Sequence, residues 1–236
     1  MTAPGPRLNH KRKELSLSTS SIAQQVGDMR ATVAAQPEND ALDVFEREQS
    51  ALAALGEPEG VLRVGSTLPD VELIGPDGAP TTLGEAAGGR PAVVVFYRGA
   101  WCPYCNIALS NYQVLLLPAL SDRAVRLIAV SPQGPDGSLT MQQKHDLAFA
   151  VLSDPGNVLA HVMGIVTAPS SEVRAAQLQL GLDLTAVNAD STTGLPWPTI
   201  AILDAGRTLR WIDVHADYST RTEADDIIAA LDALTL

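Results

Sequence analysis

Cys102 and Cys105 are the only two thiols of this chain, and two residues separate them. They follow an apolar run, residues 93–97, whose β-branched and aromatic side chains predict a strand buried on both faces. Apolar residues then recur with the spacing of one helix face over residues 104–117. The cysteines therefore fall at a strand-to-helix turn, where unpaired backbone N–H groups of the first helical turn favour a thiolate. This arrangement is typical of a redox-active dithiol.

Three other uses of the two cysteines are weaker. A zinc site needs about four ligands, and the histidines offer no paired ligand spacing to complete one. The histidines are His10, His145, His161 and His215. A structural disulfide within one helical turn closes almost no loop and adds little stability. Two inert buried thiols leave the spacing and the flanking Trp101 and Pro103 unexplained, so redox chemistry is favoured.

Other polar residues near the predicted site have two interpretations each. Arg98 is either a cation that keeps Cys102 ionised or a solvated residue at the end of a strand. Trp101 and Tyr104 are expected to form walls beside the dithiol. A metal triad can be drawn through the alternating residues of segment 213–217 (Asp213, His215, Asp217). A solvated strand end is the favoured interpretation of that segment, because no further ligand completes the set.

The composition describes an acidic globular protein. The 236 residues are 46% hydrophobic with a net charge of −11, which disfavours nucleic acid and anionic membrane surfaces as partners. No apolar run approaches the roughly 18 residues of a membrane span, and the polar N-terminus lacks the apolar segment of a signal peptide. Two cysteines in a chain of this length suit a reducing compartment. We therefore expect a cytoplasmic protein, with no metal and no other cofactor.

The chain divides into an extension, residues 1–59, and a main domain, residues 60–236. Residues 1–19 have the polar, Gly- and Pro-containing composition of a disordered tail. Two helices are predicted between residues 20 and 55, each with a narrow apolar stripe. The stripes are Ile22, Val26, Met29 and Val33 in the first helix, and Leu42, Phe45, Leu52 and Leu55 in the second. Such stripes suit packing on the main domain or on a partner subunit, so a homodimer through these helices is one expectation.

The main domain alternates strands and helices, which indicates an α/β sandwich with a mixed central sheet flanked by helices. A hairpin is expected over residues 71–83, with further strands at 125–130, 151–152, 199–203 and 208–214. Helices are expected at 138–149, 158–163 and 172–180. A capping box of Thr222 with Asp225 is expected to begin a last helix that runs to about Leu234.

Several segments resemble the thioredoxin superfamily and, more narrowly, the peroxiredoxin-like branch of the alkyl hydroperoxide reductase/thiol-specific antioxidant (AhpC/TSA) family. The matching segments are Phe96–Asn106 (FYRGAWCPYCN), Ile128–Gln133 (IAVSPQ), Leu152–Asp154 (LSD), Pro198–Thr199, Asp204–Gly206 (DAG) and Asp217–Arg221 (DYSTR). The resemblance covers residue 60 to the C-terminus and implies a thioredoxin-like fold. It also implies that Pro198 is a cis-proline that faces the dithiol.

The chain departs from conventional peroxiredoxins in two places. Those enzymes place Thr or Ser three residues before the reactive cysteine, and counting back from Cys102 gives Gly99. They also carry an arginine where this chain has Pro198. Both missing groups bind the peroxide oxygens, so the resemblance leaves the efficiency of peroxide reduction open.

The sequence as a whole predicts a thiol-dependent antioxidant oxidoreductase. Cys102 is expected to be the exposed nucleophile of lower pKa, and Cys105 the buried resolving thiol, supported by Arg98, Trp101, Pro103 and Pro198. A hydroperoxide would be the substrate, and thioredoxin or glutathione would reduce the disulfide that forms. Two alternatives remain: a thioredoxin- or glutaredoxin-like disulfide oxidoreductase without peroxidase activity, and a redox-sensing interaction module.

Overall fold

The structure, a computed structural model, describes residues 20–35, 40–56, 58–135 and 147–235. Its centre is a mixed seven-stranded sheet in the order β2-β1-β5-β4-β3-β8-β9. The strands are β1 (Glu72–Ile74), β2 (Pro80–Thr82), β3 (Ala92–Phe96), β4 (Arg126–Ser131), β5 (Ala150–Ser153), β8 (Thr199–Leu203) and β9 (Leu209–Val214). β3 runs parallel to β4 and antiparallel to β8. The mixed α/β fold expected from the sequence is confirmed.

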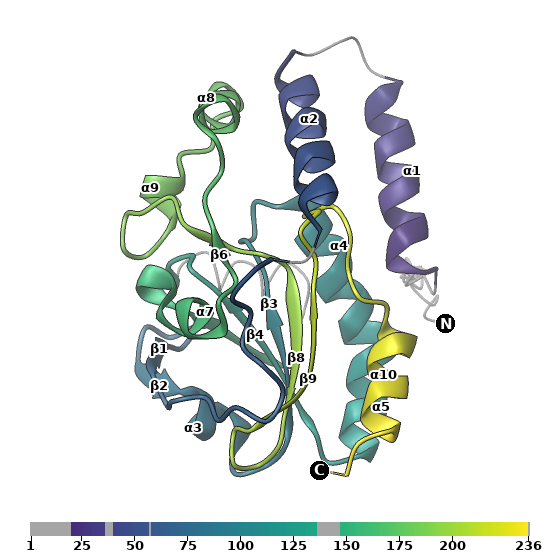
Figure 1. The fold of residues 1–236 in the computed structure, drawn as a ribbon, viewed down its shortest axis with the longest axis vertical. Coiled ribbons are helices and arrows are strands. Elements are labelled where there is room, and N and C mark those ends of the chain that lie inside the picture. The colour runs from purple at the N-terminus through teal and green to yellow at the C-terminus, as the bar shows by residue number, and fades with distance from the viewer. Residues whose placement is uncertain (1–19, 36–39, 57, 136–146, 236) are drawn as a thin grey trace, which may run out of the picture.

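Helices cover both faces of this sheet (Figure 1). One face carries α4 (Pro103–Asn111), α5 (Leu117–Asp122) and α10 (Ala224–Asp232). The other face carries α3 (Leu83–Ala87) and α7 (Val158–Met163), the latter preceded by a 3₁₀ turn (Pro155–Asn157). Because side chains alternate along a strand, β3 supplies both cores: Val93 and Val95 pack toward α4, and Val94 and Phe96 toward the opposite layer. Two-sided burial thus explains the continuous apolar run.

The dithiol helix is longer than its apolar spacing predicted. After α4 the chain passes through a π-helical turn (Tyr112–Leu116) and continues as α5. Pro118 lies in the first turn of α5 and has no N–H to donate to the preceding turn. Such a residue interrupts the regular α-helical hydrogen bonding, and a widened turn is one way to absorb that interruption.

The predicted helices of the extension are α1 (Ile22–Ala34) and α2 (Asp40–Leu55). They lie beside each other at the end of the sheet where α4 begins (Figure 1). α1 packs against α4, and α2 packs against α8 (Ser171–Gln179). Ile22 and Val26 are buried in the core that surrounds α4. The stripe of α1 therefore packs on its own chain, and dimerisation through these helices stays a prediction.

Several local expectations were wrong. Leu83 begins helix α3 instead of ending a strand, because Thr82 and Glu85 form a capping box. A short strand, β7 (Leu195–Pro196), pairs with β6 (Val166–Thr167), and neither is among the expected strands. Thr222 does not cap α10, whose N-cap is Glu223. The Thr222 hydroxyl donates instead to the Asp213 carboxylate, at 2.8 Å.

Some expectations cannot be compared with the described residues. The expected helix at 138–149 lies mostly outside them, and its last three residues, 147–149, are not helical. The predicted tail, residues 1–19, also lies outside them, as do His10 and His145. A short helix, α9 (Leu184–Val187), follows α8 in the described part of the chain. Among the described residues, none of the helices has the length and apolar composition needed to cross a bilayer.

Candidate active site: a buried dithiol and two arginines

The two cysteines lie where the sequence placed them, at the start of α4. Cys102 is the N-cap residue, Pro103 the first helical residue, and Cys105 lies within the first turn. Both thiols are free, but only 1% of Cys102 and none of Cys105 is exposed. The expectation that Cys102 is exposed was therefore wrong. Helices α1 and α2 cover the turn that carries the cysteines. The sequence around the cysteines alone does not reveal this cover.

Cys105 has a cationic partner from a distant segment. The Nη2 atom of Arg221 lies 2.9 Å from the Cys105 sulfur. Burial by itself would raise the pKa of Cys105. The hydrogen bond from the Cys102 thiol, the charge of Arg221 and the backbone N–H of Arg98 together lower that pKa well below its usual value. The geometry therefore stabilises a thiolate on Cys105.

Cys102 has the opposite tendency. Burial is the main cause that raises its pKa well above the usual value, and the hydrogen bond and charge of Cys105 raise it further. The charges of Arg98 and Arg221 lower this pKa, but by less. The expected order of the two pKa values is thus reversed.

Arg98 is part of the site and not a solvated strand end. It is 6% exposed. Its guanidinium carbon lies 3.9 Å from the ring centroid of Tyr218 and 5.2 Å from that of Trp101. Cation–π contacts of this kind hold a desolvated guanidinium in place. Arg98 therefore supplies a second fixed positive charge beside the sulfurs.

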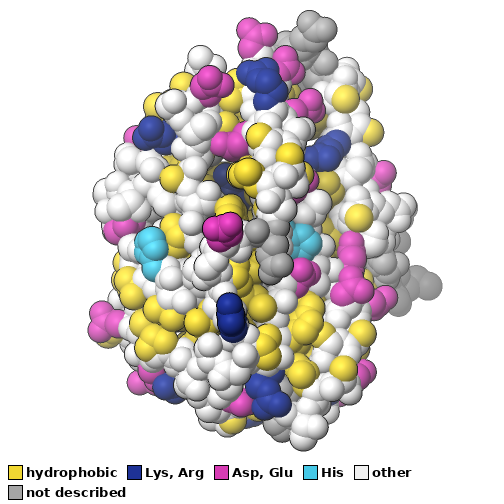
Figure 2. Space-filling view, viewed as in Figure 1, with side chains coloured by type: hydrophobic (Ala, Val, Ile, Leu, Met, Phe, Trp, Pro, Cys, Tyr) yellow, Lys and Arg dark blue, Asp and Glu magenta, His cyan; other side chains and the backbone are white. Residues whose placement is uncertain are grey.

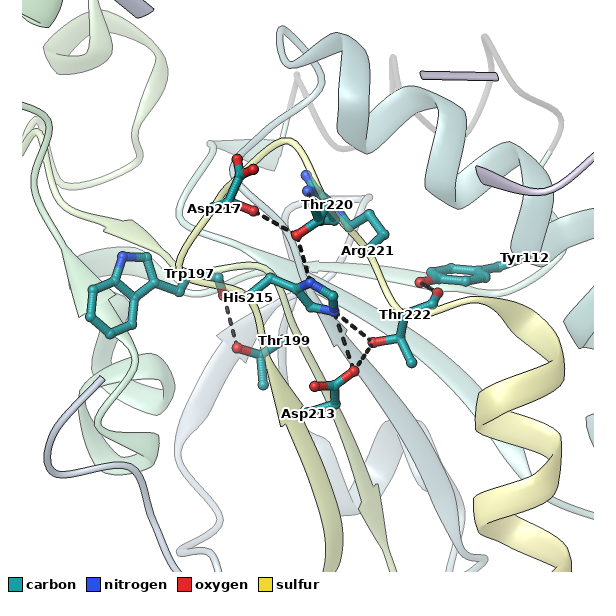
Figure 3. Close-up of polar contacts among 9 residues, drawn as sticks. All are labelled: Tyr112, Trp197, Thr199, Asp213, His215, Asp217, Thr220, Arg221 and Thr222. Atoms are coloured by element: carbon teal, nitrogen blue, oxygen red, sulfur yellow. Dashed lines mark hydrogen bonds and ion pairs between the residues drawn. The ribbon is translucent and has the colours of Figure 1, made fainter. Parts of the chain in front are cut away.

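Arg221 is positioned by a hydrogen-bonded loop that follows β9 (Figure 3). Around His215, one ring nitrogen lies 2.7 Å from the Thr220 hydroxyl and the other lies 3.2 Å from the Asp213 carboxylate. The Thr222 hydroxyl donates to the same carboxylate, at 2.8 Å. The hydrogen bond to His215 is the leading cause that lowers the pKa of Asp213. These contacts fix the residues on both sides of Arg221.

Two further hydrogen bonds join the loop to the helix layer. The Tyr112 hydroxyl, in the π-helical turn, donates to the backbone carbonyl of Thr222 at 2.7 Å. Arg221 donates through Nη1 to the backbone carbonyl of Tyr218, also at 2.7 Å. The segment 213–217, interpreted from the sequence as a solvated strand end, instead contributes His215 and Asp213 to this network. Over the described part of the chain, no group of three or more His, Cys, Asp or Glu side chains is placed to hold a metal.

The structure explains why residue 99 is glycine. Its φ of +148° is a conformation that side chains rarely adopt, and a Cβ atom there would overlap the Trp101 indole and the Gln133 amide. The Gln133 side chain meanwhile accepts a hydrogen bond from the Ala100 N–H at 2.6 Å. A threonine could not occupy this position without displacing both neighbours.

Pro198 is not a cis-proline, because no peptide bond of the described residues is cis. The chain passes through it from β7 to β8 while both backbone groups of Trp197 are engaged. The Trp197 N–H donates to Ile165 at 2.8 Å, and its carbonyl accepts from the Thr199 hydroxyl at 2.9 Å. The Trp197 backbone is therefore engaged within the protein, and the cis-proline that the resemblance implied is absent from the described residues.

A cavity of about 690 Å³ opens beside Cys102. Its inner wall contains Arg98, Trp101, Pro103 and Tyr104, as expected for the aromatic pair. The opposite walls come from α1, α2 and the segment after α8. Of the two cysteines, Cys102 is the one among the residues that line it. A small molecule in this cavity therefore approaches the dithiol from the side of Cys102.

Comparison with known proteins identifies the family. A model of the AhpC/TSA family matches residues 64–212, more than half of the chain. This chain belongs to the AhpC/TSA family. It thus lies in the thioredoxin superfamily, as the resemblance implied.

Solved structures share the fold of this AhpC/TSA protein at low sequence identity. The peroxidoxin BcpB of Mycobacterium tuberculosis is 18% identical, with a TM-score of 0.57, over 74% of this chain and 99% of its own. The reduced Prx3 of Vibrio vulnificus, in complex with hydrogen peroxide, is 20% identical, with a TM-score of 0.58, over 72% and 99%. AhpC of Mycobacterium tuberculosis is 20% identical, with a TM-score of 0.54, over 73% and 93%. No curated protein matches the sequence.

The structure gives a direct cationic partner to Cys105 through Arg221. No arginine stands at Pro198. The sequence contained one signal for Arg221, the Asp217–Arg221 segment, but nothing in its spacing connected it with a cysteine 116 positions away.

Proposed function

We propose that this AhpC/TSA protein reduces hydroperoxides through a cycle between the Cys102/Cys105 dithiol and its disulfide. The observation that carries the proposal is the 2.9 Å contact between Arg221 and the Cys105 sulfur, in a site where the pKa of Cys105 is strongly lowered. A thiolate is the form of cysteine that attacks a peroxide oxygen. Fixed donors beside it also stabilise the charge that develops on the departing oxygen.

The Cys105 thiolate attacks the terminal oxygen of the hydroperoxide, so that a sulfur–oxygen bond forms as the oxygen–oxygen bond breaks. The products are a sulfenic acid on Cys105 and an alkoxide, or hydroxide from hydrogen peroxide. The Cys102 thiol gives its proton to that leaving oxygen. The Cys102 thiolate then displaces hydroxide from the sulfenic acid, and the hydroxide leaves as water after taking up a proton. An external thiol pair, from thioredoxin or glutathione, reduces the disulfide.

A single-turnover experiment tests this cycle. The reduced protein is mixed with hydrogen peroxide in a stopped-flow instrument, and the loss of thiols is followed with the Trp101 fluorescence. We expect one equivalent of peroxide to be consumed per dithiol, faster than a free cysteine reacts. In Cys102→Ser the reaction should stop at a sulfenic acid on Cys105 that dimedone traps. A rate no higher than that of free cysteine would exclude the peroxidase.

A disulfide oxidoreductase is the second candidate, and the cavity favours it. Because Cys102 lines the cavity, an incoming disulfide would meet this sulfur first, with Cys105 behind it as the resolving thiol. Cys105→Ser would then form a stable mixed disulfide through Cys102. Formation of that adduct, together with peroxide reaction no faster than that of a free thiol, would favour this function.

A further inference from the structure

About half of the lining of the cavity beside the dithiol comes from outside the part of the chain that matches the family. The match begins at residue 64, and α1 and α2 line the cavity with Val33, Leu42, Phe45 and polar residues that include Arg30 and Gln49. The extension therefore does more than cover the sheet, because it adds a wall to the reactive centre. Figure 2 shows, in the view of Figure 1, charged side chains of both signs dispersed over this part of the surface.

Three polar residues around that wall, Arg30, Gln49 and Tyr104, are engaged with one another. Arg30 donates to the Gln49 amide oxygen at 2.6 Å, and its guanidinium lies 5.8 Å from the Tyr104 ring centroid. The Gln49 amide nitrogen donates to the Tyr104 hydroxyl at 3.4 Å. On the inner wall, Arg98 is held between Trp101 and Tyr218. What the cavity offers a ligand is chiefly its apolar surface.

The volume of the cavity far exceeds what hydrogen peroxide needs. A water molecule occupies about 30 Å³ in the liquid, and hydrogen peroxide has only two heavy atoms. A cavity of about 690 Å³ lies within the range of sites that enclose whole organic molecules. The charged side chains of its lining balance, because Arg30 and Arg98 stand against Asp43 and Glu46, so the lining has no net charge that would favour an ionic ligand.

We propose that the helical extension determines the substrate specificity of the dithiol, with Val33, Leu42 and Phe45 selecting uncharged hydroperoxides that carry a branched-alkyl or aromatic body. This inference rests on the proposed peroxidase function and goes beyond it, because the selecting residues belong to α1 and α2. The body of the substrate occupies the apolar cavity, and its terminal oxygen points toward Cys102 and Cys105. Apolar groups that fit such a pocket change specificity by about 10- to 200-fold for each methylene-sized difference.

The experiment compares two peroxides on the reduced full-length protein in single turnover. Cumene hydroperoxide is the bulky uncharged probe, and hydrogen peroxide is the small one. We expect the wild-type rate constant to favour cumene hydroperoxide by about tenfold or more. In Leu42→Gln the ratio of the two rate constants should fall toward one, because a polar group then lines the apolar wall. Val33→Gln on the other helix is a second, independent variant with the same expectation.

Leu55→Gln is the matched control. Leu55 lies in the same helix α2 as Leu42, but it is 77% exposed and does not line the cavity, so both rate constants should stay at the wild-type value. Circular dichroism checks that each variant keeps its helices. A wild-type ratio near one, or an unchanged ratio in both wall variants, overturns the inference while leaving the peroxidase intact. Reaction with neither peroxide would overturn the proposed function and this inference together.

Discussion

The segment that matches the AhpC/TSA family and the two segments outside it contribute different parts of the dithiol site. Residues 64–212 supply both sulfurs and the buried Arg98. The segment after residue 212 supplies Arg221, which contacts Cys105, and Tyr218, which stacks on Arg98. The extension before residue 64 supplies one wall of the cavity. The family core thus provides the reactive atoms, one cation and part of the cavity wall, and the segments on either side of it add the second cation and the opposite wall.

The largest expected effect lies in the core. Replacing Cys105 by serine removes the thiolate, and we expect the rate of peroxide reduction to fall by about 10³-fold or more. Cys102→Ser should retain a single turnover, since Cys105 keeps Arg221. Stopped-flow measurements on the two variants compare them directly. If Cys102→Ser were the inactive variant and Cys105→Ser the active one, the nucleophile would be Cys102.

The next largest effect tests the C-terminal segment. In Arg221→Met the guanidinium is lost, burial then dominates, and the pKa of Cys105 should rise. At neutral pH we expect the peroxide rate to fall by about 10²- to 10³-fold, as on removal of a preorganised charge-stabilising donor. Arg221→Lys should recover part of the loss, because it restores the charge without the planar fork.

The pH dependence of Arg221→Met gives a sharper readout. In the wild type the lowered pKa keeps Cys105 ionised near neutrality, so the rate of alkylation by iodoacetamide should be almost constant there. In the variant this rate should climb with pH into the alkaline range. The lowered pKa of Cys105 also affects the free energy of unfolding. Its contribution stabilises the fold fully above the usual pKa of a thiol, and it disappears as the pH falls through the lowered pKa of the folded protein. Identical alkylation profiles would show that Arg221 does not set the ionisation of Cys105.

A smaller loss of peroxide rate is expected from Thr222, which only positions the loop that carries Arg221. Thr222→Val deletes the hydroxyl that donates to Asp213 while keeping the shape of the side chain. A hydrogen bond contributes about 0.5–1.5 kcal/mol, so we expect the peroxide rate at neutral pH to fall by about threefold to tenfold. Thr222→Ser keeps a hydroxyl and should behave like the wild type. A loss in Thr222→Val as large as in Arg221→Met would mean that the loop, and not the cation, is limiting.

The smallest effect belongs to an arginine away from the site. Arg123 pairs with Asp232 at 2.9 Å on the surface, with side chains 35% and 56% exposed. Exposed pairs of this kind contribute little, so Arg123→Met should leave the alkylation profile and the peroxide rate unchanged. It controls for the loss of a positive charge from the chain. A slower variant would imply that long-range charge, rather than contact, governs the thiolate.

The sequence predicted the features that depend on neighbouring residues, and it missed those that depend on segments far apart in the chain. The fold, β3 and the start of α4 follow from local periodicity, because two-sided burial and helical spacing are visible over a few residues. The charge on Cys105 depends on a residue 116 positions away, and no local pattern encodes such a distance. The expected exposure of Cys102 failed for a related reason, because α1 and α2, which cover the dithiol, are remote from it in sequence. The expected cis-proline came from the resemblance and not from a local pattern.

The Glu223 carboxylate connects the C-terminal segment to the first turn of α1. The N-cap of α10, Glu223, lies two residues after Arg221, and its carboxylate also accepts the Ile22 and Ala23 N–H groups that begin α1, at 2.9 and 2.8 Å. Hydrogen bonds therefore connect the start of α1 to the residue that follows the Arg221 loop, across about 200 positions of the sequence. During synthesis, chain segments emerge in order from the N-terminus. The first turn of α1 is therefore fully hydrogen-bonded only after Glu223 has been synthesised, so a nascent chain contains both thiols before Arg221 can contact Cys105.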